Sequence, residues 1–140
     1  MADVVAELAA DGGAYDAMVI PGGFAPDYMR RNEDMKNAIV TMLKNGKPVA
    51  AICHGPWMFC SARKETGEPI IAGQDCTAFV AIKDDLLNAG ANFIDAPAVV
   101  SAPIFDHPGG TIITSRTPKD LTPFCRAIID AVAGLSLIHI

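Results

Sequence analysis

The sequence predicts an α/β domain with a mainly parallel sheet, and two observations lead to this fold class. The first is the order of elements early in the chain, where residues 15–20, an amphipathic stretch after Asn32 and residues 49–52 read as strand, helix and strand. The second is that residues 49–52 show no alternation of apolar and polar side chains, which is typical of a parallel strand buried on both faces. A right-handed crossover places the carboxyl ends of both strands, Ile20 and Ile52, at the same sheet edge.

The composition supports one globular domain. Of the 140 residues, 51% are hydrophobic and 19% are charged, and the mean hydropathy is +0.29, values too apolar for a disordered chain. No apolar run approaches the roughly 20 residues that cross a bilayer. The formal net charge of −5 and the lack of a Lys/Arg cluster argue against a surface for nucleic acid or anionic membranes, so we expect small molecules or proteins as partners.

The elements up to residue 60 follow from local signals. The first strand stops at residues 21–23, a Pro-Gly-Gly loop sequence. The helix that follows is capped by Asn32 and is expected to end at Asn45-Gly46, because glycine readily adopts the left-handed backbone of a helix end. Residues 57–60 are apolar on every face and predict a buried helix in the core.

The second half of the chain predicts helices and short strands. A polar loop at 63–68 precedes a helix at 82–89 that ends at Gly90. The last helix begins at Thr117, where an N-cap residue, proline at the first position and Asp120 at the third are followed by an apolar stripe. Strands are expected at 93–94, 99–100 and 111–114, and they give the sheet an antiparallel fringe.

The four cysteines, Cys53, Cys60, Cys76 and Cys125, form no C-x-x-C pair and have no histidine at metal-ligand spacing. We therefore expect neither a zinc site nor a disulfide framework, and no metal or cofactor. Residues 2–8 provide neither the basic nor the apolar region of a signal peptide. A reducing, cytoplasmic location fits these features.

The segment with chemical information is residues 49–56. A nucleophile between a strand and a helix lies in a sharp bend, and the residues two before and two after it must be small. Ala51 and Gly55 meet that requirement around Cys53. A helix N-terminus behind the thiol stabilises thiolate over thiol. Most cysteines that are buried in a protein core have a packing role and no catalytic one, and we interpret Cys60, Cys76 and Cys125 in this way.

Several segments, in order across residues 14–134, together have the pattern of a known family: 15–23, 25–30, 46–56, 82–85, 88–90, 114–118 and 120–121. They resemble the PfpI-type branch of the parkinsonism-associated deglycase superfamily. The resemblance implies a flavodoxin-like three-layer α/β sandwich in which Cys53 is the nucleophile and His54 its acid/base partner. It also implies an oxyanion hole formed by the backbone N–H groups of Gly23 and His54.

Further expectations follow from the resemblance. The carboxylate that orients the histidine comes from a neighbouring subunit and falls on Asp27, so a homo-oligomer with the site at a subunit interface is implied. The chemistry is thiolate addition to a carbonyl, as in a protein deglycase, a glyoxalase or an intracellular cysteine peptidase. The substrate is then a small carbonyl compound or a glycated protein or peptide.

Other readings of these residues stay open. His54 is also compatible with an ordinary helix start, Asp27 with a turn or cap, and Gly22 and Gly23 with a turn that needs positive φ. Arg116 fits either a salt bridge or substrate binding. His107 is read as a solvated loop residue.

The extent of the resemblance predicts a domain at 1–134 that lacks about the first third of the family fold, including its N-terminal strands and a glutamate near the thiol. Residues 135–140 have no counterpart and are interpreted as an adapter-derived tail. Such a fragment exposes an unpaired sheet edge, so we expect poor solubility and little activity from these 140 residues alone.

Two other functions compete with the hydrolase. In the first, a non-catalytic redox sensor or holdase chaperone, Cys53 is oxidised to sulfinate and turns over no substrate. The second is an amidotransferase glutaminase domain, which needs a His-x-Glu pair late in the chain. Residues 115–120 contain no such pair, which argues against it.

Overall fold

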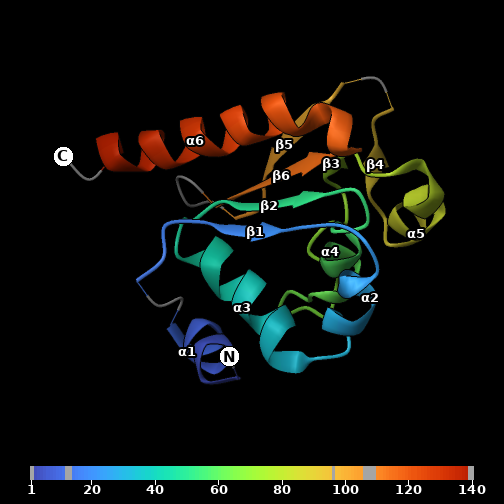
Figure 1. Cartoon of the computed structure of the whole chain (residues 1–140). Coiled ribbons are helices and arrows are strands. Elements are labelled where there is room, and N and C mark those ends of the chain that lie inside the picture. Colours follow the sequence, from blue (N-terminus) through green and yellow to red (C-terminus); the bar gives the residue numbers. More distant parts are fainter. Residues whose placement is uncertain (1, 12–13, 96, 106–109, 139–140) are drawn as a thin grey trace.

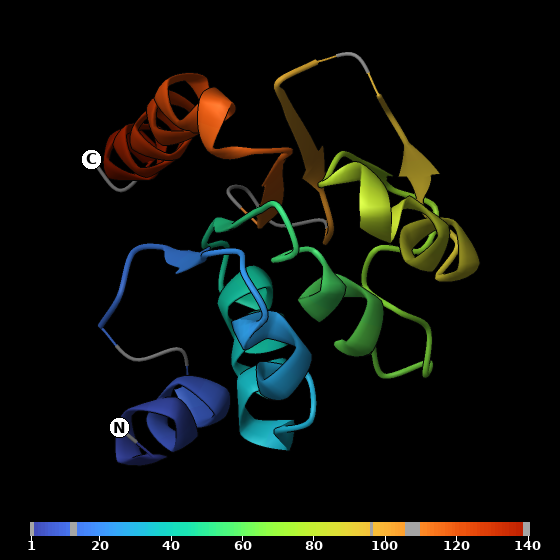
Figure 2. The same cartoon turned by 45° about the vertical axis from the view of Figure 1, so that its right-hand side comes forward.

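The computed structural model describes residues 2–11, 14–95, 97–105 and 110–138 and has three layers (Figure 1). A four-stranded sheet in the order β1-β2-β6-β5 forms the middle layer. The C-terminal helix α6 (Leu121–Ile138) covers one face, and α3 (Glu33–Lys44) lies against the other with α1 (Ala2–Asp11) outside it (Figures 1 and 2). The predicted flavodoxin-like α/β class is confirmed.

The predicted strand–helix–strand unit is present. β1 (Met18–Ile20) pairs in parallel with β2 (Val49–Ile52), with Ile20 opposite Ala51, so both strands end at the same sheet edge. The side chain of Asn32 caps α3 by accepting a hydrogen bond from the Met35 N–H at 2.9 Å. All four residues of β2 are buried, as the absence of alternation predicted.

The second half of the sheet contains the expected antiparallel fringe. β6 (Thr111–Ser115) pairs in parallel with β2, and β5 (Val99–Pro103) pairs antiparallel with β6. The predicted strand at 93–94 is shifted by one residue and belongs to a separate two-stranded sheet, β3 (Asp75–Cys76) with β4 (Asn92–Phe93). Two-residue strands carry too little periodicity to be found in the sequence. His107 lies outside the described residues.

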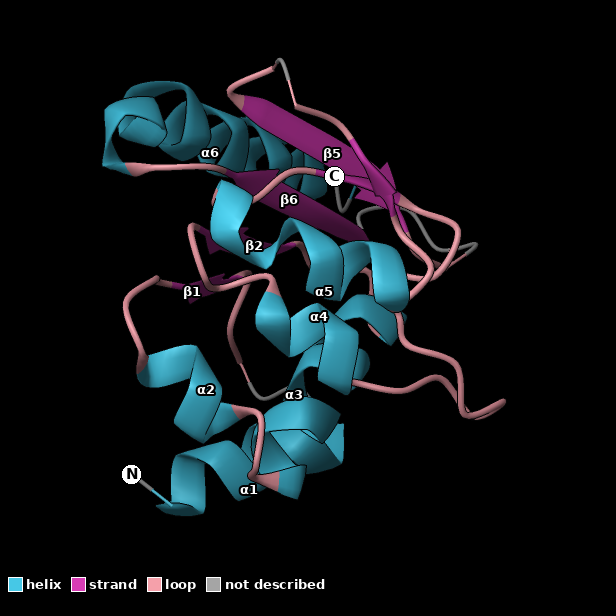
Figure 3. Cartoon of the chain, turned by 90° about the vertical axis from the view of Figure 1, so that its right-hand side faces the viewer, coloured by secondary structure: helices cyan, strands magenta, loops and turns pink. Residues whose placement is uncertain are grey.

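Short helices gather at the carboxyl edge of β1 and β2 (Figure 3). As predicted, a helix begins at Trp57, after a turn of four residues that follows β2, and another helix ends just before Gly90, whose φ is +89°. The polar loop at 63–68 is also present, mostly exposed. The short helices are α2 (Ala25–Met29), α4 (Trp57–Ser61), the 3₁₀ turn η1 (Val80–Ile82) and α5 (Lys83–Asn88).

The start of the last helix differs from the prediction. Residues Pro118–Asp120 form a 3₁₀ turn, η2, and the Thr117 hydroxyl makes no capping hydrogen bond. The Asp120 carboxylate accepts instead from Arg116, four residues earlier. The carboxylate that the sequence pattern assigns to a capping box is therefore bound in the ion pair with Arg116. At its other end α6 continues to Ile138.

Two apolar clusters hold the layers together. The larger lies between the sheet and α3 and α4, and includes Ile39, Leu43 and Phe59, all fully buried. The smaller lies under α6 around Phe124. β1 stands at the edge of the sheet, where the Val19 side chain is 52% exposed. Within the described part of the chain, every helix is too short or too polar to span a membrane.

Candidate active site

Cys53 has the backbone of a strained bend. It follows β2 directly with φ of +63°, and among the described residues every other positive φ belongs to a glycine. A side chain in this left-handed region costs roughly 1–2 kcal/mol, and such strain gathers at functional sites. The bend is fixed by two hydrogen bonds, from the Cys53 N–H to the Ser115 carbonyl at 3.1 Å and from the Phe79 N–H to the Cys53 carbonyl at 3.0 Å.

The small residues that the bend requires are in place. A Cβ at Gly55 would lie 2.7 Å from the Ile20 carbonyl oxygen and 3.0 Å from the Ile52 nitrogen. A side chain there cannot be accommodated without moving the backbone of both strands. The prediction that the residue two after Cys53 must be small is therefore confirmed, and Ala51 on the other side is fully buried.

The loop after β1 lies directly against the Cys53 side chain. A Cβ at Gly22 would lie 2.7 Å from the Cys53 Cβ and 3.3 Å from its sulfur. Gly22 and Gly23 were both interpreted as residues of a turn that needs positive φ. This is correct for Gly23, whose φ is +72°, and wrong for Gly22, whose φ is not positive. Gly22 is needed because the two segments approach closely, which a single sequence does not reveal.

His54 lies beside the thiol. The Cys53 sulfur is 3.2 Å from Nδ1 of His54, a contact in which either atom donates, depending on the imidazole tautomer. The ring is held by three aromatic side chains, with centroid distances of 5.0 Å to Trp57, 5.1 Å to Phe79 and 6.2 Å to Phe24. Phe24 is 77% exposed, so this aromatic cage opens to solvent.

One residue of the aromatic cage, Trp57, differs from the expectation from the sequence. Trp57 was expected to be core, but it is only half-buried, and its indole N–H donates to the Asp85 carboxylate at 2.8 Å. Met58 and Phe59, its neighbours in α4, are fully buried as expected. Sequence reasoning missed Phe24 and Phe79 as neighbours of His54, because they lie 30 residues before it and 25 after it in the chain.

Asp27 lies in the first turn of α2, and its side chain is 41% exposed. Its carboxylate pairs with Arg31 on the same helix. Among the described residues, the hydrogen bonds of Asp27 do not include one to His54 of its own chain. The role expected for Asp27 is one between subunits, and it stays a prediction.

The backbone donors predicted for an oxyanion hole lie in the two loops that flank the thiol. Gly23 belongs to the loop after β1, and His54 to the turn after β2. In the described part of the chain, neither N–H group donates to another protein atom. By contrast the Cys53 N–H is already used by the Ser115 carbonyl.

The remaining cysteines differ from Cys53 in exposure. Cys60 and Cys76 are buried, and desolvation raises the pKa of Cys60 to about 11 and that of Cys76 to about 12. Both thiols are therefore protonated at neutral pH. Cys125 is exposed on α6. Across the described residues, His, Cys, Asp and Glu side chains form no group of three or more that could hold a metal ion.

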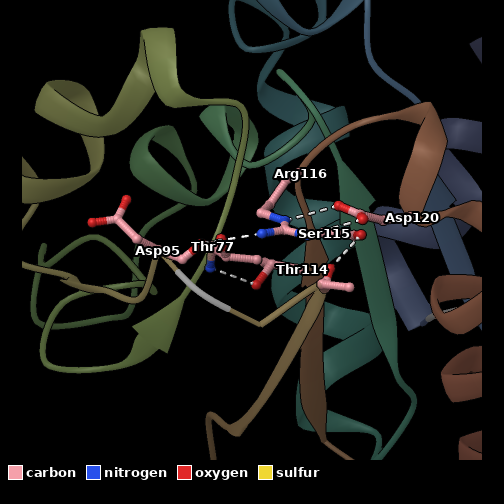
Figure 4. A network of polar contacts seen from close by, with 7 residues as sticks. Thr77, Asp95, Thr114, Ser115, Arg116 and Asp120 are labelled. Atoms are coloured by element: carbon pink, nitrogen blue, oxygen red, sulfur yellow. Dashed lines mark hydrogen bonds and ion pairs between the residues drawn. The ribbon is translucent and has the colours of Figure 1, made fainter.

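Arg116 belongs to a polar network at the end of β6 (Figure 4). Its guanidinium donates to the Asp120 carboxylate at 2.9 and 3.0 Å and to the Asp95 carbonyl at 3.2 Å. The salt-bridge reading of Arg116 is confirmed. Next to it, the Ser115 hydroxyl donates to the Ala98 carbonyl at 2.6 Å, and these contacts connect the end of β6 with η2 and with the loop before β5.

The model of the DJ-1/PfpI family matches residues 1–131. "Putative cysteine protease YraA" of Bacillus subtilis is 41% identical over 116 residues, which are 83% of this chain and 60% of that protein. "Deglycase PH1704" of Pyrococcus horikoshii is 38% identical over 115 residues, 82% of this chain and 61% of that protein. The chain thus spans about three fifths of the length of these relatives.

Solved structures show the same likeness. A two-domain protein from Anabaena variabilis, containing DJ-1/ThiJ/PfpI-like and ferritin-like domains, superposes with a TM-score of 0.70 at 41% identity, over 85% of this chain and 30% of that one. DJ-1beta of Drosophila melanogaster superposes with a TM-score of 0.72 at 25% identity, over 93% of this chain and 62% of that one.

Proposed function

Because the chain belongs to the DJ-1/PfpI family, we propose that it carries the reactive thiol of a cysteine-dependent hydrolase or deglycase, with Cys53 as nucleophile. The observation that carries the proposal is the strained Cys53, whose sulfur lies 3.2 Å from Nδ1 of His54. Relatives named deglycases and a relative named as a cysteine protease support the same reaction class.

The proposed reaction begins with addition of the thiol to a carbonyl. The Cys53 sulfur forms a bond to the carbonyl carbon while its proton passes to Nδ1 of His54, and the electron pair of the C=O π bond moves to the oxygen. The N–H groups of Gly23 and His54 stabilise that oxyanion, because neither is used within the described part of the chain. The imidazolium then returns its proton to the leaving group or to the adduct oxygen.

The site is completed by a second copy of the chain. In the proposed assembly, Asp27 of one copy accepts a hydrogen bond from the His54 ring of the other. The exposed position of Asp27 on α2 suits that role, and release of the Arg31 ion pair costs little because both side chains are exposed. The exposed Phe24 and Tyr28 next to it, 77% and 67% exposed, offer apolar area for such a contact.

The proposed substrates are small carbonyl compounds and the adducts that they form with proteins or peptides. The aromatic cage around His54 opens to solvent through Phe24, so a group attached to a larger carrier can reach the thiol. The acidic net charge of −5 disfavours nucleic acid as the main carrier.

The decisive experiment measures covalent capture of a carbonyl at Cys53. The chain is incubated with methylglyoxal, and the adducts are located by peptide mass spectrometry in the native protein, in Cys53→Ala and in Cys125→Ala. We expect the adduct at Cys53, complete loss of it in Cys53→Ala, and retention in Cys125→Ala, which removes the other accessible thiol. Turnover of a methylglyoxal–thiol adduct is followed in parallel.

Two outcomes contradict the proposal. Unchanged capture and turnover in Cys53→Ala would remove Cys53 from the chemistry. Conversion of Cys53 to sulfinate by peroxide, with no carbonyl adduct, would favour the redox-sensor function.

A further inference from the structure

The imidazole of His54 has one polar contact among the described residues, the contact of its Nδ1 with the Cys53 sulfur at 3.2 Å. The orientation of a functional histidine is commonly fixed by a hydrogen bond to its second ring nitrogen. Because the described part of the chain supplies no such bond, packing must hold the ring within one chain. The shortest of its ring-to-ring distances, 5.0 Å between centroids, is to Trp57.

The indole of Trp57 is itself held from two sides. Its N–H donates to the carboxylate of Asp85 on α5 at 2.8 Å. The guanidinium of Arg30, on α2, lies over the ring at 5.6 Å from the centroid and donates to the Ser61 hydroxyl at 2.8 Å. The two helices lie on either side of α4, which begins at Trp57 (Figure 3). A charge-assisted hydrogen bond and a cation–π contact together restrict rotation of the indole.

The rings of Trp57 and His54 meet in a T-shaped arrangement, with an interplanar angle of 62°. This is one of the preferred geometries of aromatic pairs. The two residues are also joined through the backbone, since the Trp57 N–H donates to the His54 carbonyl at 3.1 Å. Removal of the indole would therefore leave space directly beside the imidazole, into which that ring can turn away from the sulfur.

The other two rings of the aromatic cage are less suited to this task. Phe24 is 77% exposed, and its centroid is 6.2 Å from that of His54. Phe79 is closer, at 5.1 Å, but a phenyl ring has no hydrogen-bond donor by which its orientation is fixed. Of the three cage residues, only Trp57 has a side chain that a hydrogen bond anchors.

We propose that Trp57 is a positioning residue that holds the His54 imidazole against the Cys53 thiol, and that Asp85 acts through it by fixing the indole. The role of the thiol and the imidazole rests on the proposed function. Neither Trp57 nor Asp85 touches the reacting atoms. They act within one chain, whereas the proposed hydrogen bond from Asp27 needs a second copy.

The first test measures ring orientation by NMR and does not depend on the chemistry of Cys53. Trp57 is the only tryptophan in the sequence, so its indole N–H gives a single signal. In the native chain we expect nuclear Overhauser contacts from the His54 ring protons to the indole and to the Cys53 β-protons. Asp85→Ala should weaken both and speed exchange of the indole N–H with solvent. Asp84→Ala removes an exposed carboxylate one residue earlier in α5 and should change neither.

The second test measures turnover of a methylglyoxal–thiol adduct. Because positioning acts on the reacting geometry, Asp85→Ala should lower kcat about three- to tenfold and leave KM unchanged. Asp85→Asn, which keeps a carbonyl oxygen as acceptor for the indole N–H, should restore most of the rate. Trp57→Phe should lower kcat to a similar degree. In that background Asp85→Ala should have no further effect, because the phenyl ring has no N–H for Asp85 to bind.

Unchanged Overhauser contacts and unchanged kcat in Asp85→Ala, with carbonyl capture at Cys53 intact, would overturn the inference and leave the proposed function in place. A rise in KM alone would also overturn it, because Trp57 would then bind substrate and not position His54. Failure of the proposed function gives a different result, in which Cys53→Ala captures the carbonyl as well as the native chain does. The Overhauser contacts in Asp85→Ala still decide in that case whether the indole holds the imidazole.

Discussion

The sulfur of Cys53 lies 3.2 Å from Nδ1 of His54, although adjacent residues in a strand would point to opposite faces. The positive φ of Cys53, +63°, ends the strand and turns both side chains to the same side. The thiol and the imidazole are therefore in contact because of the backbone bend at Cys53, and adjacency in the sequence would not by itself bring them together.

That backbone strain predicts an unusual effect of glycine at position 53. Cys53→Gly should be more stable than Cys53→Ala by about 0.5–1 kcal/mol, because glycine adopts positive φ without the steric cost of a Cβ. Urea unfolding of the two variants measures the difference. Ala133→Gly in exposed α6 is the control, and there glycine should lower stability by about 1 kcal/mol. If glycine is also the less stable residue at position 53, the bend is not strained.

A methyl group at Gly55 should disrupt the bend. Its Cβ would lie 2.7 Å from the Ile20 carbonyl, so Gly55→Ala should lower the free energy of unfolding by about 1–3 kcal/mol and slow carbonyl capture at Cys53. The matched variant is Gly134→Ala in α6, where the new Cβ has no described atom within 4 Å apart from its chain neighbours and the backbone of the helix itself. That variant should raise stability by about 0.5–1 kcal/mol. Similar behaviour of both variants in thermal unfolding would contradict the steric argument.

The four thiols should separate into two classes on alkylation. Burial raises the pKa of Cys60 to about 11 and that of Cys76 to about 12, so both remain protonated and inaccessible at pH 8. Iodoacetamide should modify Cys53 and Cys125 in the native chain and all four thiols in urea. Peptide mass spectrometry gives the site of each modification. Fast native labelling of Cys60 or Cys76 would show that the core around them opens.

The ion pair at the start of α6 should make stability depend on acid pH. Hydrogen bonds from Arg116 hold the pKa of Asp120 below its ordinary value, so the folded chain binds this proton more weakly than the unfolded chain. The stabilisation is complete above the ordinary Asp pKa of roughly 3.9 and is lost as pH falls through the lower folded pKa. The stability difference between the native chain and Asp120→Asn should therefore shrink from pH 6 to pH 3.

Urea unfolding midpoints at several pH values provide the measurement for Asp120. Asp130→Asn, on the exposed surface of α6, serves as the control and should show a smaller difference at pH 6. A difference for Asp120→Asn that stays constant with pH would mean that the carboxylate charge contributes nothing to this pair.

Local patterns were sufficient for the strand–helix–strand unit and for the bend. Asn32 caps its helix through the third N–H along, and a Cβ at Gly55 would lie 3.0 Å from the backbone nitrogen and oxygen of Ile52, three residues earlier. These relationships act over one or two turns of chain, so the sequence that encodes them is contiguous. The same reasoning identified Cys53 and His54 as a candidate pair.

Contacts between distant segments could be decided only by the tertiary structure. Gly22 meets Cys53, Phe79 meets His54, and the Thr77 N–H meets the Thr114 hydroxyl across 37 residues. Thr117, which has the residue type of a helix cap, makes no capping bond with its hydroxyl, and the Asp120 N–H donates instead to the Thr117 carbonyl at 2.9 Å. Such contacts depend on which loops the sheet places next to one another. The periodicity of apolar residues along a single sequence does not report this arrangement. The sequence by itself therefore determined the fold class and the candidate nucleophile, whereas packing decided the surroundings of that nucleophile.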